Sequence, residues 1–279
     1  MKCLIVKAIL GFGDRLEFLK MCVAYSLKYD IKLIIDWSDP VWGESFQKYF
    51  LLDVPTMSID DIEETDTVYP EYWKGKLKEQ FNMEIANSRP DLKTEQLTVP
   101  LQYDVIVVIS TGKRTLYDNS SFFTSRLRVI DQRILSEVQN RRNIYDLSKK
   151  WGIHLRGTDR ASTLAYKQKR LSELSVKLVA QGLFSGGSLI AVSDDKDYID
   201  MWKARFPEYP ILTNLIFHSG RTGTHMVTDS LKSKDELNVE LLVDFFTLAS
   251  CSRVYSTSPD SRFAREAIRL SPFVNEILF

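Results

Sequence analysis

The segment 154–160 (HLRGTDR) brings a histidine, two arginines and an aspartate to the end of an apolar run, where a strand is expected to open into a loop. In open α/β sheets, ligands bind at the carboxyl ends of the strands. Along an extended strand, His154 and Arg156 point to the same side. The Arg156 guanidinium is a fork that suits a diphosphate, and its charge would stabilise a departing phosphate. Asp159 is a base, a cap or an ion-pair partner of the arginines, and a capped turn with solvated charges is the alternative.

A glycine-rich turn, 11–15 (GFGDR), follows the first apolar run of the chain. Glycines let a backbone approach a ligand closely, and the N-terminus of the helix that follows attracts anions. The dinucleotide-binding pattern GxGxxG is incomplete, because Leu16 stands at the third glycine position. A tight turn with an aspartate cap explains the same residues equally well. The candidate ligand-binding residues here are Gly11, Phe12, Gly13, Asp14 and Arg15.

Two adjacent aspartates, Asp194 and Asp195, follow the apolar run 188–193. Neighbouring carboxylates suggest a metal site. The simpler interpretation is that they cap a helix that starts near Lys196.

A further acid, Asp244, lies within the apolar helical segment 241–248. A carboxylate among such neighbours costs free energy unless it is paired. Its partner is either an arginine or the N–H groups of a ligand.

The segment 255–265 (YSTSPDSRFAR) predicts a strand, a hydroxyl-rich turn and a helix. This geometry forms an anion cradle, with Arg262 as a nearby cation. A series of helix-capping residues, with Ser258 as the cap, is the alternative. The candidate residues in the turn are Thr257, Ser258, Asp260 and Ser261.

The elements that must position these residues follow from apolar periodicity. Strands and helices alternate in both halves of the chain, and only 38–100 is irregular, with loops and short helices expected. The pattern predicts an α/β fold of two Rossmann-like domains facing a central cleft, over residues 1–147 and 148–279. Strands are expected at 3–6, 32–35, 104–110, 152–156, 188–193, 210–213 and 253–256, and helices at 15–29, over most of 122–148, and at 169–181, 238–251 and 261–270.

The composition excludes several classes of protein. The 279 residues hold 37 Lys+Arg and 37 Asp+Glu, so the chain lacks the net positive field that non-specific nucleic-acid binding needs. Three widely spaced cysteines form no CxxC pair, which argues against a disulfide framework and for a reducing compartment. No apolar run approaches the length of a membrane span, and no cleavage-site pattern is present, so a cytoplasmic location is expected.

The motifs GFGDRL, IHLRGTDRAS, IAVSDD and LLVDFFTLASCSRVYSTSPDSRFAREA occur in this order, and together they resemble the fucosyltransferase superfamily. That group includes rhizobial nodulation fucosyltransferases, the α1,6-fucosyltransferases of N-glycan cores and protein O-fucosyltransferases. The resemblance covers the first 40 residues and about 150–270. It implies a GT-B fold, a nucleotide-sugar donor in the cleft, inversion at the sugar and no required metal.

The resemblance also implies roles for individual residues. Arg156 would hold the β-phosphate of the donor, His154 would contact the nucleotide, and Asp244 would bind the guanine. Asp194 and the hydroxyl-rich turn at 257–261 would complete the donor site.

Three departures from the family pattern concern the donor site and the base. Gly157 replaces a second arginine, Leu164 replaces a glutamate that is a candidate base, and Asp260 stands where a serine is usual. Without that glutamate, Asp14 is the first candidate for the general base and Asp159 the second.

We therefore expect an inverting, metal-independent glycosyltransferase without a cofactor. It would move L-fucose from GDP-fucose to a hydroxyl of an oligosaccharide or glycoconjugate acceptor. One alternative is the same scaffold with another nucleotide sugar, such as UDP-xylose. Another is a non-catalytic nucleotide- or glycan-binding module.

Overall fold

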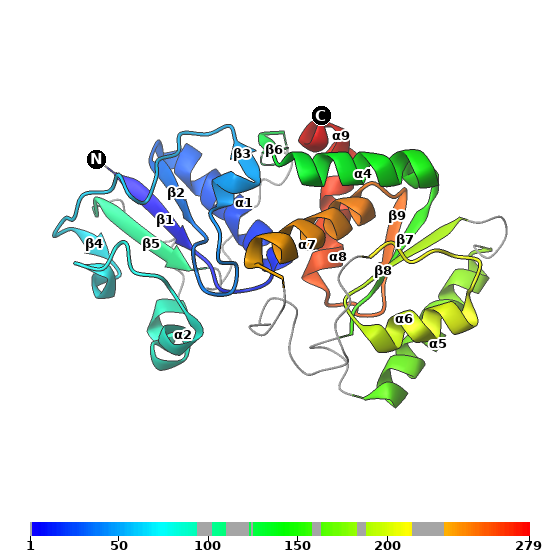
Figure 1. Cartoon of the computed structure of the whole chain (residues 1–279). Helices are drawn as coiled ribbons and strands as arrows, with labels where there is room; N and C mark the ends of the chain where they lie inside the picture. The colour runs from blue at the N-terminus through cyan, green and yellow to red at the C-terminus, as the bar shows by residue number, and fades with distance from the viewer. Residues whose placement is uncertain are drawn as a thin grey trace. The chain divides into compact units, whose positions relative to one another are not determined.

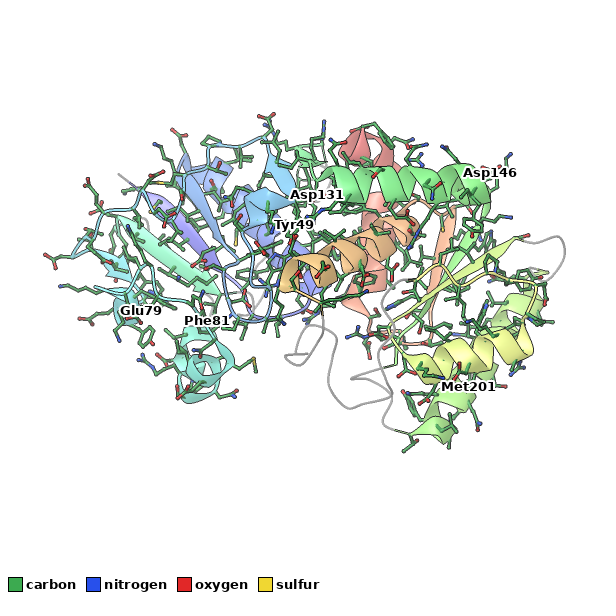
Figure 2. All side chains as sticks on the ribbon, in the orientation of Figure 1. Tyr49, Glu79, Phe81, Asp131, Asp146 and Met201 are labelled. Carbon is green, nitrogen blue, oxygen red and sulfur yellow. The ribbon has the colours of Figure 1, made fainter. Side chains whose placement is uncertain are left out.

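Figure 1 shows the fold as a computed structural model, which describes residues 2–93, 102–109, 123, 125–157, 163–182, 188–213 and 232–279. The chain forms two compact units, Met1–Asp131 with Glu276–Phe279, and Gln132–Asn275. The division falls before the predicted boundary at residue 147. Helix α4 (Gln132–Tyr145), flanked by Asp131 and Asp146 in Figure 2, belongs to the second unit because it packs against helix α7 of that unit.

The first unit is built on a four-stranded parallel sheet with the order β2-β1-β5-β4. Its strands are β1 (Cys3–Lys7), β2 (Lys32–Asp36), β4 (Val68–Tyr69) and β5 (Val105–Ile109). Helix α1 (Phe12–Tyr29) joins β1 to β2 and completes the predicted βαβ unit. All residues of β1 and β5 are buried, as continuous apolar runs predict for parallel strands covered on both faces.

The irregular segment after β2 supplies much of the core of the first unit. Cys3, Ile5 and Val107 share one cluster with Trp73 and Phe81, the latter labelled in Figure 2. The short elements are the 3₁₀ helices η1 (Phe46–Lys48), η2 (Glu71–Trp73) and η3 (Pro90–Lys93), helix α2 (Met83–Ser88), and strand β3 (Phe50–Leu52), which pairs antiparallel with β6 (Leu127–Val129). The segment 122–148, expected to be mainly helical, therefore contains a strand as well as α4.

A buried ion pair connects the glycine-rich turn to the loop after β2. The Arg15 guanidinium donates to both oxygens of Asp39 at 2.8 and 2.9 Å, and its Nε donates to the Leu10 carbonyl at 2.6 Å. The guanidinium also lies 5.5 Å from the Trp37 ring and 5.3 Å from the Trp42 ring. Arg15 is 1% exposed. These contacts place its charge inside the protein.

The second unit is a three-layer α/β/α arrangement around a parallel sheet with the order β8-β7-β9. In Figure 1, helices α5 and α6 cover one face of this sheet, while α7 and α8 cover the other. The strands are β7 (Trp151–Leu155), β8 (Leu189–Ser193) and β9 (Arg253–Ser256). The remaining elements are α5 (Leu164–Ala180), α6 (Lys196–Arg205), α7 (Lys234–Ala249), α8 (Arg262–Leu270), α9 (Val274–Leu278), η5 (Leu147–Lys149) and η7 (Ser271–Phe273).

Capping residues explain why two helices start earlier than expected, whereas α1 starts three residues before the predicted 15 without a side-chain cap. Helix α7 starts four residues before the predicted 238, because Ser233 and Glu236 form a capping box ahead of it. Helix α5 starts earlier than 169, because the Thr163 side chain caps it. The prediction of a strand at 210–213 was wrong. In this segment the structure has one isolated β-bridge, between Ile211 and Ala191.

We expect Arg15→Met to lower the free energy of unfolding by about 3–5 kcal/mol, because it leaves the buried Asp39 carboxylate without its cation. Urea unfolding measures the loss. The control Lys48→Met removes the exposed pair with Glu44 and should cost at most about 1 kcal/mol. Equal losses in the two variants would show that the buried ion pair does not stabilise the turn.

Candidate functional site

The carboxyl ends of the three strands of the second unit meet at one edge of the sheet. Leu155 pairs with Ser193, and His154 pairs with both Val192 and Ser256. A small pocket opens at this edge, with a cavity volume of about 40 Å³. The lining residues are His154, Arg156, Val192, Ser193, Asp194, Leu241, Asp244 and Phe263.

Arg156 is held at the end of β7 by an ion pair. Its NH1 donates to Asp194 Oδ2 at 2.7 Å, and the backbone N–H of Gly157 donates to Asp194 Oδ1 at 3.2 Å. The Arg156 side chain is 18% exposed and the Asp194 side chain 13%. The pair is therefore largely buried but still in contact with the pocket, where an anion can meet the guanidinium.

His154 is oriented by two hydroxyl groups. Its Nδ1 lies 3.3 Å from Ser256 Oγ and 3.2 Å from Ser261 Oγ. Its ring also packs 5.2 Å from the Phe263 ring, measured between centroids. The histidine is 3% exposed, so the hydroxyl contacts satisfy one nitrogen of a buried ring.

The hydroxyl-rich turn at 257–261 holds neighbouring residues of the site in place, and not all of its side chains face the pocket. Thr257 Oγ1 accepts from the Arg156 backbone N–H at 3.0 Å, and the Thr257 carbonyl accepts from Arg170 Nε at 2.7 Å. Ser261, rather than the expected Ser258, caps α8 by accepting from the Ala264 N–H. Ser258 is half-buried and Asp260 is exposed, and both lie on the turn outside the helix.

The two adjacent acids have different partners. Asp195 caps α6 by accepting from the Tyr198 N–H at 3.0 Å, which confirms the capping interpretation for this residue. Its other oxygen accepts from the buried Lys167 at 2.6 Å. Asp194 instead pairs with Arg156. No group of three or more His, Cys, Asp or Glu side chains in the described ranges is arranged to hold a metal ion.

Asp244 is paired with an arginine, one of the two partners considered from its sequence. Arg141 NH1 donates to Asp244 Oδ1 at 3.0 Å, the Thr213 hydroxyl contacts Oδ2, and the carboxylate lines the pocket. Burial raises the pKa of Asp244 to about 7, although the Arg141 charge and the Thr213 hydrogen bond act in the opposite direction. The site therefore holds a buried carboxyl group that titrates near neutrality.

Arg141 was not predicted as a site residue, although its position in the helix pattern indicates burial. It is buried on the same stripe of α4 as Ile134 and Val138. Positions i, i+4 and i+7 of a helix share one face, so an arginine at the third of them predicts a buried partner.

Gly157 has no room for a side chain. A Cβ at this position would lie 2.4 Å from both Cβ and Cγ of Asp195. Asp195 is itself held by the α6 cap and by Lys167. The second arginine that the family resemblance implies at this position is therefore excluded by packing as well as by sequence.

The glycine-rich turn lies in the first unit, and only part of it remains a candidate. Gly11 precedes α1 without a side-chain cap, and Asp14 is half-buried in the first turn of the helix. Gly13 is buried, and Phe12 is buried between the rings of Trp42 and Phe50. The expectation that Arg15 binds a ligand is not supported, because its guanidinium is paired with Asp39 inside the protein. Asp159 lies outside the described residues.

Comparisons with known proteins identify the fold. No protein-family model matches the sequence, and no curated protein matches it. The structure of NodZ α-1,6-fucosyltransferase co-crystallized with GDP aligns with a TM-score of 0.70 and 17% identity, over 98% of this chain and 93% of that one. The NodZ structure soaked with GDP-fucose aligns with a TM-score of 0.66 and 17% identity, over 98% and 94% of the two chains. A variant of Arabidopsis thaliana FUT1 in complex with GDP aligns with a TM-score of 0.59 and 13% identity, over 97% and 68%.

The predicted fold class is thus confirmed: the chain has the mixed α/β, GT-B type fold of these fucosyltransferase structures. A shared fold does not by itself carry an activity, so the function is argued from the site. In the part of the chain that the structure describes, no helix is both long and apolar enough to cross a membrane.

We expect Gly157→Ala to lower the free energy of unfolding by about 1–3 kcal/mol, because the new methyl group overlaps the fixed Asp195 side chain. The matched control is Gly152→Ala in β7, the strand that ends two residues before Gly157. There the Cβ would meet the flexible end of Leu248 at 2.9 Å, so the loss should be smaller. Chemical unfolding measures the loss of stability in both variants. A larger loss for Gly152→Ala than for Gly157→Ala would contradict the prediction.

The raised pKa of Asp244 predicts a pH dependence of stability. The folded protein retains this proton where the unfolded chain, with the ordinary value of 3.8, has lost it. The contribution of this group to stability is therefore complete below pH 4 and is lost as the pH rises through about 7, at up to about 1.4 kcal/mol per pH unit. Asp244→Asn lacks this titration.

Urea unfolding of Asp244→Asn and of the unsubstituted chain between pH 4 and 8 measures the effect. As the pH rises to about 7, we expect the free energy of unfolding of the unsubstituted chain to fall relative to that of Asp244→Asn. Above that pH the difference between the two should be constant. Asp235→Asn, a partly exposed acid at the start of the same helix, is the control. If the free energies of unfolding of Asp244→Asn and of the unsubstituted chain changed with pH in parallel, the pKa of Asp244 would not be raised.

Proposed function

We propose that this chain is a glycosyltransferase that uses a nucleotide-diphosphate sugar, with GDP-fucose as the donor, and transfers the sugar with inversion to a glycan hydroxyl. One observation carries the proposal. In the second unit, Arg156, His154 and Asp244 converge on a pocket at the carboxyl ends of three parallel strands. Ligands bind at such strand ends in open α/β sheets. Structures with the same fold were solved with GDP and soaked with GDP-fucose.

Arg156 is the proposed ligand of the donor's β-phosphate. Asp194 orients its guanidinium, and a planar guanidinium binds phosphate oxygens through two parallel N–H groups. When the sugar–phosphate bond breaks, negative charge accumulates on the leaving diphosphate. A fixed cation next to that charge stabilises the transition state more than the ground state. We propose that this cation takes the role that a metal ion has in other transferases.

Asp244 is the proposed contact for the base. A guanine presents two neighbouring N–H donors on its Watson–Crick edge, and a carboxylate accepts both. A uracil presents only one such donor, which favours GDP over UDP. His154, held by two serine hydroxyls, would contact the nucleotide beside this carboxylate.

The acceptor hydroxyl needs a general base. We propose Asp14, in the first turn of α1, as this base and Asp159 as the second candidate. Leu164 occupies the position where the resembling family has a glutamate, and its side chain cannot take a proton.

A second function is favoured by one observation. Both carboxylates that line the described pocket, Asp194 and Asp244, are ion-paired with arginines. A pocket of this kind can bind a nucleotide without catalysing transfer. A non-catalytic nucleotide-binding module is therefore the competing proposal, and turnover separates the two.

A thermal-shift panel of GDP, UDP, GDP-fucose and UDP-xylose tests the donor class. A ligand that binds only the folded state raises the melting temperature according to its affinity. We expect GDP and GDP-fucose to stabilise the chain more than the uridine compounds. A larger rise in melting temperature with UDP than with GDP would contradict GDP-fucose and indicate a UDP-sugar as the donor.

Hydrolysis of the stabilising donor, without and with glycan acceptors, tests the enzyme. Arg156→Ala should lower the rate by about 10²–10³-fold, as expected for the loss of a strong transition-state donor. Arg253→Ala, an exposed arginine on the edge strand of the same sheet, is the matched control and should retain the rate. A donor that binds but is never cleaved by the unsubstituted chain would support the non-catalytic module.

A further inference from the structure

The strongest unexplained feature of the second unit is a buried arginine behind the pocket. Arg141 comes from α4, which packs alongside α7, the helix that carries Asp244 (Figure 1). Arg141 and Asp244 are each 4% exposed. Burying an arginine is costly unless its donors are satisfied, so its contacts indicate what it holds in place.

The Arg141 guanidinium is fixed by four groups. Its NH1 donates to the Leu212 carbonyl at 2.6 Å, to Asp244 Oδ1 at 3.0 Å and to Thr247 Oγ1 at 3.2 Å. Its Nε donates to Glu137 Oε1 at 3.1 Å. The guanidinium therefore has little freedom to turn away from Asp244.

The Asp244 carboxylate is held at both oxygens. Arg141 contacts Oδ1, and the Thr213 hydroxyl, which also contacts the Ser193 carbonyl, reaches Oδ2. Each oxygen of an ionised carboxylate has a second acceptor position. Because Asp244 lines the pocket, a ligand can approach it.

We propose that Arg141 is a positioning residue for base recognition: it favours the ionised form of the Asp244 carboxylate and fixes its orientation, so that both oxygens accept N–H donors of a guanine-like edge. The inference rests on the proposed nucleotide-binding function of this pocket. Without the guanidinium, a carboxyl group this deeply buried takes up a proton. A protonated carboxyl group offers one donor and one acceptor, which suits the amino group and ring nitrogen of adenine better than the two donors of guanine.

Other charged groups near Asp244 are common to all the variants compared. They are Glu137 on α4, Glu240 on α7, His154 and Arg156 at the end of β7, and Asp194 after β8. A change in pH dependence on substitution of Arg141 alone is therefore assigned to the Arg141–Asp244 pair.

Isothermal titration with GDP, IDP and ADP between pH 6 and 8.5 tests the inference. The unsubstituted chain should prefer GDP to ADP by about 10–100-fold, the discrimination expected of one bidentate contact. IDP, which lacks one N–H donor of guanine, should bind with intermediate affinity. Arg141→Met should lose at least about tenfold of the GDP preference, and its GDP affinity should reach half its maximum at a higher pH.

Two further variants keep the test decisive. Arg133→Met breaks an exposed ion pair between α4 and α7, with Asp235, and should match the unsubstituted chain. Arg141→Lys is the variant to use if Arg141→Met does not fold. It keeps the charge but not the fork, so the pH profile should stay near normal while the GDP preference falls.

An unchanged ratio of GDP to ADP affinity in folded Arg141→Met, or in Arg141→Lys if the methionine variant does not fold, would overturn the inference and leave the proposed function standing. If the unsubstituted chain bound none of the three nucleotides, the proposed function would fail and the inference with it.

Discussion

A buried cation requires an anion beside it, and this requirement organises both units of the protein. In the first unit, Arg15 turns inward and pairs with Asp39, which ties the glycine-rich turn to the loop after β2. In the second unit, Arg141 pairs with Asp244 and joins α4 to α7 behind the pocket. Asp244, which looks available for ligand chemistry in the sequence, is therefore needed first to neutralise a buried arginine. It can also serve a ligand, because it lines the pocket.

This constraint changes the electrostatic picture of the candidate site. In the sequence, Arg15, Arg156 and Arg262 each stand at or beside a turn that could bind an anion. Among the described residues that line the pocket there is one arginine, Arg156, and it is paired with Asp194. The site before ligand binding is thus nearly balanced in charge, and a diphosphate would share the guanidinium with Asp194. A balanced, preorganised pair costs little reorganisation when an anion arrives, which fits the proposed binding of a diphosphate.

Most of the regular structure could be predicted, because burial leaves a regular pattern along the chain. The all-apolar runs at β1, β5 and β8 agree with the expected strands to within one residue at each end. The antiparallel pair β3–β6 was not predicted, since each strand has only three residues and its partner lies far along the chain. The starts of α5 and α7 were misplaced because the side chains of Thr163 and Ser233 cap these helices.

The sequence by itself determined the order of the longer strands and helices, the fold class and the motifs at the strand ends, because apolar periodicity and turn chemistry act between near neighbours. Only the tertiary structure decided which of those residues are committed to one another. Asp244 meets an arginine 103 residues away, and Arg15 points into the core. Asp195 closes the space beside Gly157. Such pairings depend on how whole helices pack, and no local pattern specifies which distant side chain will arrive at a given carboxylate.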